Sequence, residues 1–335
     1  MNKAVAVKAF AKINLSIDIL GKMENGYHSI KTVMQQVDLY DDIVIESKGK
    51  AGLFAGYKIS LEINDSNNPD SNNSAEIELP QGDDNLAYRA AKIMAETYCP
   101  LKDNNITIKL VKRIPMAAGL AGGSSDAAAV MLGLCKLWNI DTPLKELFKI
   151  GADIGADIPF CITGNAKNNP SLGFSKDEIA SSAALAEGIG EIITPLPSLR
   201  GWVILAKPDI SVSTEYVYRQ LSEYKVLPGQ GKEIEIPDTE KLIDGLENNN
   251  YMQVLKSMTN VLETVSLKEY PIVVYTKNKI AEITSSQKIL MSGSGPTVFA
   301  YFNDEKSTHE AFKKICDTLL GESGYKYNIQ SAKLL

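Results

Sequence analysis

The chain has 335 residues, of which 44% are hydrophobic and 23% charged, and its formal net charge is −6. This length and composition indicate a globular protein with room for two hydrophobic cores. The acidic balance argues against a general nucleic-acid or membrane-surface binder, because such proteins need a basic surface. Lysines interrupt the apolar residues near the N-terminus, so we predict no signal peptide, no membrane span and a cytoplasmic location.

Residues 5–20 alternate between two faces, as expected of a β-strand. One face is apolar, and Lys12, Asn14, Ser16 and Asp18 share the other. Without other information, such a polar face is expected to point to solvent, whereas a functional lysine would lie beside an acceptor. A turn at residues 24–26 and a second strand-like run to about Ile45 predict a hairpin or meander.

The next elements are predicted from their polarity and periodicity. Residues 64–75 are too polar to bury and predict an exposed loop. A helix is expected from residues 84–86 to about Tyr98, followed by a strand at residues 106–110. The segment after residue 126 is expected to be a helix, with Val130, Met131, Leu134, Leu137 and Trp138 on one apolar face.

A glycine- and serine-rich segment, PMAAGLAGGSSDAAA, occupies residues 115–129. Gly119, Gly122 and Gly123 let backbone N–H groups approach an anion, and Ser124–Asp126 are expected to cap the following helix at its positive end. The spacing matches neither the Walker A loop nor the dinucleotide-binding motif. We therefore predict a polyphosphate site, with an ordinary helix N-terminus after a flexible turn as the alternative.

A second candidate group lies at residues 151–160. Asp157 is flanked by Ala, Ile, Pro and Phe, and a carboxylate in such an apolar setting needs a cation nearby. Asp153 competes for the same role, because a four-residue spacing would place both on one helical face. Pro159 makes Asp157 the member at the end of the helix, so we favour Asp157.

Few strong patterns mark the second half of the chain. A helix begins near Thr142, and residues 164–184 lack periodicity and predict a loop or a short insertion. Residues 202–206 predict a buried strand, a helix opens near Ser213, and residues 272–275 and 289–291 are further apolar runs. The turn SGSGPT at residues 292–297 is either a structural hairpin or, together with the loop at 119–126, a second backbone-rich surface for one anionic ligand.

Cysteine and histidine contents limit the possible metal chemistry. The four cysteines, Cys99, Cys135, Cys161 and Cys316, form neither a C-x-x-C pair nor a disulfide framework, so we expect reduced thiols. Two histidines cannot build a histidine-rich metal centre, which excludes zinc hydrolases. No metal-ligating residue is predicted beyond a role for Ser125 in positioning the ion, and any metal is expected to be Mg²⁺ arriving with a nucleotide.

These motifs in this order resemble the GHMP kinases, the superfamily of galactokinase, homoserine kinase, mevalonate kinase and phosphomevalonate kinase. Within it, residues 11–15, 21–28, 119–126, 155–160, 186–191 and 292–297 are similar to the 4-diphosphocytidyl-2-C-methyl-D-erythritol kinase family, and the GYH element at 26–28 is the most discriminating. The resemblance implies an α+β fold of two domains. An ATP-binding, ribosomal-S5-like domain would span residues 1–164, and a substrate-binding, ferredoxin-like domain residues 165–323. A return of the terminal strand, about 324–335, to the first domain is left open.

The resemblance also implies a reaction and a set of site residues. The chain would use ATP and Mg²⁺ to phosphorylate a hydroxyl of 4-diphosphocytidyl-2-C-methyl-D-erythritol, in the non-mevalonate isoprenoid pathway. Asp157 would accept the hydroxyl proton, and Lys12 would keep Asp157 ionised and offset phosphoryl charge. The implied ATP-binding residues are Pro115, Gly119, Leu120, Ala121, Gly122, Gly123, Ser124 and Ser125. The implied substrate-binding residues are Asn14, Tyr27, His28, Gly293, Ser294 and Gly295.

In this comparison Tyr27 and His28 would recognise the cytosine. The only implied partner is the small-molecule substrate, with neither a nucleic acid nor a membrane. The chain would be a monomer or homodimer. Ala121 stands where many relatives carry glycine, which is compatible with a negative φ. Segments 50–81 and 165–184 are longer than expected from the resemblance. Two alternatives remain: a GHMP kinase for another small alcohol, which Tyr27 and His28 oppose, and a catalytically inactive nucleotide-binding protein, which retention of Lys12 and Asp157 opposes.

Overall fold

The structure is a computed structural model that describes residues 3–23, 26, 28–48, 58–66, 82–98, 105–226, 234–321 and 324–335. Its tertiary contacts divide the chain into two compact units. The first unit comprises Met1–Ala11, Leu39–Ile114 and Ala121–Ser182, and the second comprises Lys12–Asp38, Pro115–Leu120 and Ala183–Leu335. This division differs from the predicted single boundary at residue 164, because two earlier segments group with the second unit. The long strands β1 (Lys3–Lys22) and β2 (His28–Lys48) contribute residues to both units.

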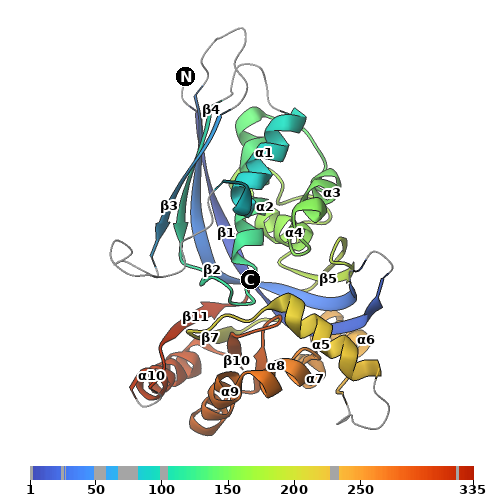
Figure 1. The fold of residues 1–335 in the computed structure, drawn as a ribbon, viewed down its shortest axis with the longest axis vertical. Helices are drawn as coiled ribbons and strands as arrows, with labels where there is room; N and C mark the ends of the chain where they lie inside the picture. Colours follow the sequence, from blue (N-terminus) through green and yellow to red (C-terminus); the bar gives the residue numbers. More distant parts are fainter. Residues whose placement is uncertain are drawn as a thin grey trace. The chain divides into compact units, whose positions relative to one another are not determined.

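The first unit combines strands with a layer of helices. The second half of β2 pairs antiparallel with β4 (Asn105–Lys112), and β3 (Lys58–Asp65) pairs parallel with β4. Figure 1 shows the helices of this unit grouped on one side of these strands. They are α1 (Leu86–Tyr98), α2 (Gly122–Trp138), α3 (Leu144–Ile154) and α4 (Ile158–Asn168), accompanied by the short 3₁₀ helices η1 (Gly82–Asp84) and η2 (Pro170–Leu172).

Helix α2 is the centre of this unit. It packs against α1 and α4, and almost every residue from Ser125 to Trp138 is buried, including the five predicted apolar positions. The alanines at 127–129 are fully buried and allow close helix packing. Gly133 approaches the strands so closely that a Cβ there would lie 2.4 Å from the Ile45 Cδ1 atom. The small alanine and glycine side chains thus allow α2 to pack closely against its neighbours.

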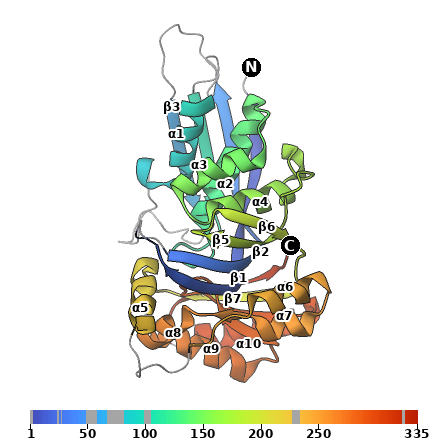
Figure 2. The same ribbon diagram turned by 90° about the vertical axis from the view of Figure 1, so that its right-hand side faces the viewer.

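The second unit contains two groups of strands. The hairpin of β5 (Ala183–Gly188) and β6 (Ile192–Leu196) pairs antiparallel with the first half of β2, as Figure 2 shows, and the short strand β8 (Thr259–Asn260) pairs parallel with β1. A separate antiparallel sheet has the order β11-β7-β10-β9. Its strands are β7 (Trp202–Pro208), β9 (Lys288–Met291), β10 (Val298–Phe302) and β11 (Tyr327–Lys333).

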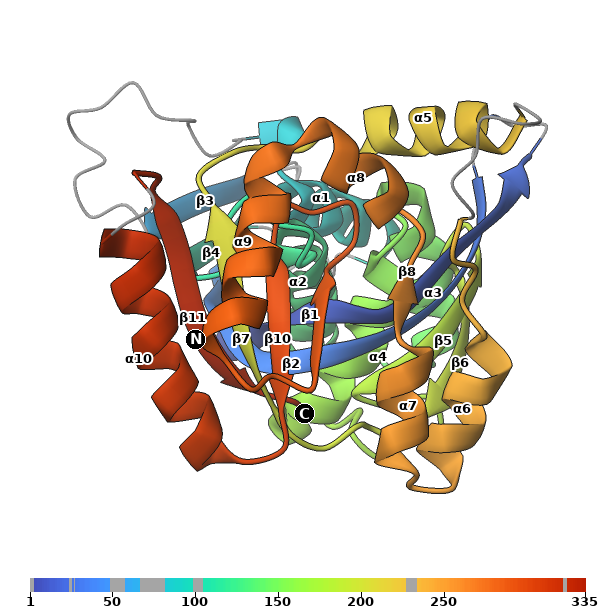
Figure 3. The same cartoon turned by 90° about the horizontal axis from the view of Figure 1, so that it is seen from below.

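Helices α9 (Pro271–Ile283) and α10 (Glu305–Gly321) pack on this four-stranded sheet (Figure 3). The remaining helices of the unit are α5 (Thr214–Val226), α6 (Thr239–Glu247), α7 (Tyr251–Ser257) and α8 (Glu263–Glu269). Because β11 pairs with β7, the terminal strand belongs to the second unit rather than to the first.

The structure differs from several local predictions. The segment after residue 164 is not a loop at first, since α4 continues to Asn168 before η2 and a series of turns lead to β5. The apolar run at 272–275 lies in helix α9. Most of the polar loop at 64–75 lies outside the described residues, as does Cys99. Burial raises the pKa of the Cys135 thiol to about 12. Among the described residues, no helix has the length and apolar character needed to cross a membrane.

Candidate active site

The polar face of β1 is buried, contrary to the solvent-facing expectation. Lys12 is 3% exposed and Asn14 is 2% exposed. The Lys12 Nζ atom donates to the Asn14 Oδ1 atom at 2.8 Å, and the Asn14 Nδ2 atom donates to the Thr32 Oγ1 atom at 2.9 Å. The Thr32 hydroxyl in turn donates to the Ser16 carbonyl oxygen at 2.6 Å. The ammonium of Lys12 is therefore oriented by a chain of hydrogen bonds within the second unit.

The two glycine-rich segments meet beside this face. The Lys12 backbone N–H donates to the Leu120 carbonyl at 3.1 Å, and the Ser292 hydroxyl donates to the Gly119 carbonyl at 3.0 Å. Gly119 has φ +74°, and a Cβ there would lie 2.3 Å from the Ser292 carbonyl oxygen. A Cβ on Gly293 would lie 3.7 Å from the Asn14 Oδ1 atom. Only glycine permits this backbone-on-backbone packing.

The loop at residues 292–297 joins β9 to β10, so it is also the structural hairpin considered from the sequence. Inside the loop, Ser292 N–H donates to the Thr297 carbonyl and Gly295 N–H to the Ser292 carbonyl. The amides of Gly293 and Ser294 form no hydrogen bond within the part of the chain that the structure describes. With Gly293 at φ +57°, the loop offers two adjacent N–H donors, an arrangement suited to an anion.

The start of α2 differs from the predicted cap. The N-cap residue is Ala121, with φ 56° and ψ 31° and no side-chain cap, and the helix begins at Gly122. The negative φ at which alanine would be tolerated in place of glycine is therefore not adopted. The prediction that residues 124–126 cap the helix was wrong, because they lie within its first turn. Gly123 is exposed, and Pro115 is partly buried at the start of the loop.

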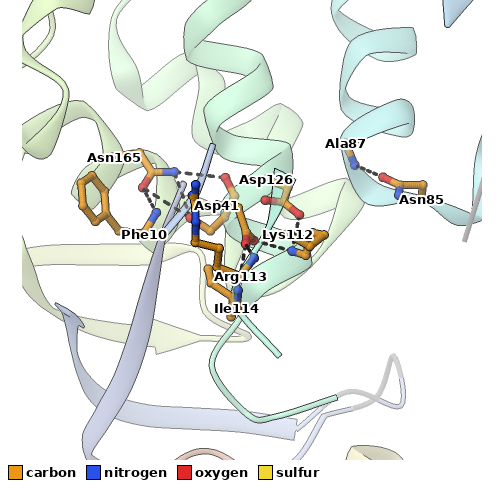
Figure 4. A network of polar contacts seen from close by, with 10 residues as sticks. Phe10, Asp41, Asn85, Ala87, Lys112, Arg113, Ile114, Asp126 and Asn165 are labelled. Atoms are coloured by element: carbon orange, nitrogen blue, oxygen red, sulfur yellow. Dashed lines mark hydrogen bonds and ion pairs between the residues drawn. The ribbon is translucent and has the colours of Figure 1, made fainter. Parts of the chain in front are cut away.

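The two serines of this turn have different surroundings. Ser125 is fully buried, and its hydroxyl exchanges hydrogen bonds with the Asn165 side chain at 3.1 and 3.4 Å. Asn165 also accepts from the Phe10 N–H at 3.1 Å, as Figure 4 shows. Ser124 is partly exposed, and its hydroxyl forms no hydrogen bond among the described residues. Ser124 is thus the serine available to a ligand.

A buried ionic cluster supports the same turn from the other side (Figure 4). The Lys112 ammonium donates to the Asp126 Oδ2 atom at 2.7 Å and to the Asp41 Oδ2 atom. The Asp41 Oδ1 atom also accepts from the backbone N–H of Arg113 and, at 2.8 Å, from that of Ile114. Burial opposes the charge on Lys112, but the two carboxylates outweigh it and raise the pKa of Lys112.

Asp126 is the unusual member of this cluster. Its Oδ1 atom is buried and has no hydrogen-bond partner among the described residues. Burial raises the pKa of Asp126, the neighbouring Asp41 adds to that increase, and Lys112 opposes it. Asp126 therefore takes up a proton more readily than an exposed aspartate does.

The two candidate aspartates differ in exposure. Asp153 is exposed on α3, whereas Asp157 is partly buried and occupies the N-cap of α4. A Cβ on Gly155 would lie 4.0 Å from the Ser124 Oγ atom, so the segment carrying Asp157 adjoins the first turn of α2. The geometry favours Asp157 over Asp153 as a site residue. Asp157 belongs to the first unit, and Lys12 belongs to the second.

His28 contacts helix α5 in the second unit. Its Nε2 atom lies 2.7 Å from the Ser222 hydroxyl, and its ring meets the Tyr218 ring edge-on with centroids 5.5 Å apart. Burial, and then the charge of Lys22, lower the pKa of His28. Tyr27 lies outside the described residues. The sequence analysis missed Tyr218 and Ser222, although their four-residue spacing places both on one helical face.

Comparison with known proteins shows which class of protein has these features. The family described as "GHMP kinases N terminal domain" matches residues 85–165. The 4-diphosphocytidyl-2-C-methyl-D-erythritol kinase of Acetivibrio thermocellus is 38% identical over 312 residues, covering 93% of this chain and 94% of that protein. The enzyme of the same name from Clostridium acetobutylicum is 40% identical over 309 residues, covering 91% of this chain and 94% of that protein.

Two solved structures share the fold. A crystal structure of 4-(cytidine 5'-diphospho)-2C-methyl-D-erythritol kinase is 25% identical, covers 98% of this chain and 99% of its own, and has a TM-score of 0.69. Homoserine kinase from Cytophaga hutchinsonii, at 16% identity and a TM-score of 0.66, covers 99% of this chain and 95% of its own. The predicted two-domain α+β fold is confirmed, and the protein is a small-molecule kinase of the GHMP class. The chain belongs to the 4-diphosphocytidyl-2-C-methyl-D-erythritol kinase family.

Proposed function

We propose that the chain transfers a phosphoryl group from ATP to a hydroxyl of 4-diphosphocytidyl-2-C-methyl-D-erythritol, using Lys12 and Asp157 as its catalytic residues. Relatives of that name match 93% of the chain. The observation that carries the residue assignment is the buried polar face of β1, where Asn14 orients the Lys12 ammonium beside two glycine-rich segments. A buried, oriented ammonium is suited to stabilising charge that develops on a phosphoryl group.

Each catalytic residue has one task. Asp157 accepts the proton of the substrate hydroxyl while the hydroxyl oxygen attacks the γ-phosphorus atom of ATP. The bond between that phosphorus and the oxygen that bridges it to the β-phosphate breaks, and ADP leaves. Lys12 offsets negative charge on the transferring group. Asn14 fixes the direction of the Lys12 ammonium through its 2.8 Å hydrogen bond. Proton removal and charge compensation are therefore supplied by different side chains.

Backbone donors hold the phosphates of ATP. The loop from Pro115 to Ala121 includes Gly119, and the first turn of the 17-residue helix α2 begins with Gly122 and Gly123. These glycines have no side chain to shield the backbone N–H groups from an anion. The N-terminus of such a helix carries partial positive charge and attracts anions. The amides of Gly293 and Ser294 add two donors for an anionic group of the substrate.

Mg²⁺ fits this site as a metal carried by the nucleotide. No group of three His, Cys, Asp or Glu side chains able to hold a metal occurs among the described residues. Mg²⁺ commonly binds through substrate phosphates, water and one or two protein oxygens. The Ser124 hydroxyl is the protein oxygen that fits, whereas the buried Ser125 hydroxyl is already bonded to Asn165. When bound, the metal would neutralise charge on the β- and γ-phosphates.

The cytosine end of the substrate is assigned to Tyr27 and His28. Aromatic stacking on a base contributes about 1–3 kcal/mol. Since its pKa is lowered, the His28 ring is held neutral, and the contact with Ser222 fixes its orientation. With Nε2 engaged by Ser222, the Nδ1 atom is the ring nitrogen that can form a hydrogen bond with the edge of the base.

The decisive experiment measures ADP release by the purified protein with ATP and Mg²⁺, using the cytidine diphosphate ester of methylerythritol, mevalonate, homoserine or no acceptor. Turnover confined to the cytidine ester is expected. Turnover with mevalonate or homoserine instead would keep the kinase and overturn the substrate assignment. ATP binding without ADP release for any acceptor would indicate an inactive nucleotide-binding protein. The cytoplasmic location and the monomer or homodimer state stay predictions.

A further inference from the structure

Asn260, at the end of β8, binds the backbone on both sides of Ser292. Its Nδ2 atom donates to the Met291 carbonyl and to the Gly293 carbonyl, each at 2.8 Å. Its Oδ1 atom accepts from the Leu262 N–H at 2.9 Å, which fixes the orientation of the amide group. The side chain is 4% exposed. The amide therefore presents its Nδ2 donor to the loop, and both contacts of that donor are with carbonyl oxygens.

Glu263 and Ser266, on helix α8, continue the same pattern. The Glu263 Oε1 atom accepts from the Met291 N–H at 2.8 Å, and its Oε2 atom accepts from the Lys277 ammonium at 2.6 Å. The fully buried Ser266 hydroxyl donates to the Ser294 carbonyl at 2.9 Å. A further contact joins the hydroxyls of Thr214 and Ser294 at 2.8 Å. Side chains from β8 and α8 thus hold both ends of the loop segment 291–294.

These contacts occupy carbonyl oxygens of the loop and leave two of its N–H groups available. The carbonyls of Met291, Gly293 and Ser294 are all occupied by side-chain donors. The N–H groups of Gly293 and Ser294 are left without an acceptor among the described residues. Because a peptide group places a C=O and the next residue's N–H on opposite sides, the Gly293 carbonyl held by Asn260 sets the direction of the Ser294 N–H. The Ser294 carbonyl held by Ser266 sets the Gly295 N–H, which donates to the Ser292 carbonyl and thereby sets the Gly293 N–H. The loop becomes a surface of preset donors.

We propose that Asn260 and Ser266 are positioning residues that aim the Gly293 and Ser294 amides at an anionic group of the substrate, with Glu263 anchoring the Met291 end. Preset donors stabilise an anion better than donors that must reorient on binding. The inference rests on the proposed function, because that function supplies the anion. It adds residues of β8 and α8 that need not touch the substrate.

The test uses two substitutions of different severity. Asn260→Asp keeps the acceptor for Leu262 N–H but replaces the donor with an oxygen that faces two carbonyls. Asn260 also lines a cavity of about 250 Å³, which leaves room on that side for the substituted side chain. Ser266→Ala removes one hydroxyl and is the milder change. The matched control is Thr276→Val, which removes buried hydrogen bonds to Ile272 and Tyr327 in the same unit.

Steady-state kinetics and amide hydrogen exchange are measured for each variant. We expect both loop variants to raise KM for the cytidine ester by about tenfold or more, as the loss of well-aimed hydrogen bonds implies, with KM for ATP within about twofold. The control should lower the melting temperature comparably without changing KM. In the wild type, the ester should slow exchange at the Gly293 and Ser294 amides, and this protection should be lost in Asn260→Asp.

Unchanged KM and retained protection in both loop variants would overturn the positioning role. Failure of the proposed function gives a different result, because the wild-type protein itself would then show no turnover with the ester. In that case inorganic diphosphate is the probe. Slower exchange at the Gly293 and Ser294 amides in the wild type but not in Asn260→Asp would support positioning, and equal exchange in both would overturn it.

Discussion

The Lys12 ammonium donates a 2.8 Å hydrogen bond to the amide oxygen of Asn14, two residues further along the same face of β1. Both side chains are almost completely buried. An ammonium is costly to bury unless polar groups compensate it, so its retention on an interior face of β1 points to a requirement beyond packing. The pair provides the most direct test of the site.

Replacing Lys12 by methionine keeps the length of the side chain and removes its charge. We expect kcat for the cytidine ester to fall about 10²–10³-fold, the size of effect seen when one group that stabilises transition-state charge is lost. KM for ATP should change little, because backbone amides hold the phosphates. Initial-rate kinetics over a range of ATP and ester concentrations measure both quantities.

Lys8→Met is the matched control for this substitution. Lys8 lies on the same strand but is exposed, with its ammonium 4.0 Å from the centroid of the Tyr40 ring. Its replacement should leave kcat within about twofold, because an exposed cation–π contact contributes only about 0.5–1 kcal/mol of stability. Equal losses in the two variants would contradict the catalytic role of Lys12.

Asp157→Asn removes the proposed general base with little change in shape. The expected loss in kcat is about 10²–10⁴-fold, equivalent to roughly 3–5 kcal/mol of transition-state stabilisation. Asp153→Asn, four residues earlier and exposed on α3, should retain nearly full activity. Rates are compared after circular dichroism has shown that both variants fold. A loss below tenfold for Asp157→Asn would mean that this aspartate is structural.

The sequence predicted elements whose signal is local. The alternation in β1, the helix at 86–98 and the apolar face of α2 each follow from short-range periodicity, and the structure contains all three. Side-chain chemistry at fixed spacing likewise singled out Lys12, Asn14 and the glycine-rich loops. The contact between Gly119 and Ser292 followed from the idea that two backbone-rich loops serve one ligand.

Other features depend on contacts between distant residues and left no local signal. The polar face of β1 looks solvent-exposed in sequence, and only tertiary packing buries Lys12. Asn260 lies over thirty positions from Gly293, to which it donates, and the two-residue strand β8 is too short to predict. The positive φ of Ala121 left no signal in the sequence, because alanine itself favours the right-handed region.

Ala121→Gly should stabilise the protein. At φ +56° the alanine adopts a left-handed conformation, which costs an L-residue about 1–2 kcal/mol. Glycine removes that strain but loses more backbone entropy on folding, by about 0.4–1 kcal/mol. The net expectation is an increase of about 0.5–1 kcal/mol in the free energy of unfolding, measured by urea denaturation.

The control for this prediction is Ala152→Gly, within helix α3. Glycine inside a helix is destabilising by about 0.5–1 kcal/mol relative to alanine, so the two substitutions should act in opposite directions. If Ala121→Gly lowered stability as much as Ala152→Gly, residue 121 would not be strained. Steady-state kinetics of Ala121→Gly would also show whether a more flexible loop alters KM for ATP.

Asp126→Asn tests whether Asp126 carries a proton in the folded protein. Burial raises the pKa of Asp126 above its ordinary value of 3.8, and its Oδ1 atom has no partner in the described part of the chain. Asparagine resembles the protonated carboxyl group, so this substitution should cost less than about 1 kcal/mol at neutral pH. Lys112→Met leaves two buried carboxyl groups without their cation and should cost about 3–5 kcal/mol.

The pH dependence gives an independent check with a definite sign. The folded-state pKa of Asp126 is raised, so its contribution to stability is complete below the unfolded-state pKa and is lost as pH rises through the folded-state value. Wild-type stability should therefore contain a component that falls as pH rises above about 4, and Asp126→Asn should lack it. Urea denaturation of both proteins at a series of pH values measures the difference. If the two curves ran parallel and Asp126→Asn were as destabilising as Lys112→Met, Asp126 would be ionised in the folded protein.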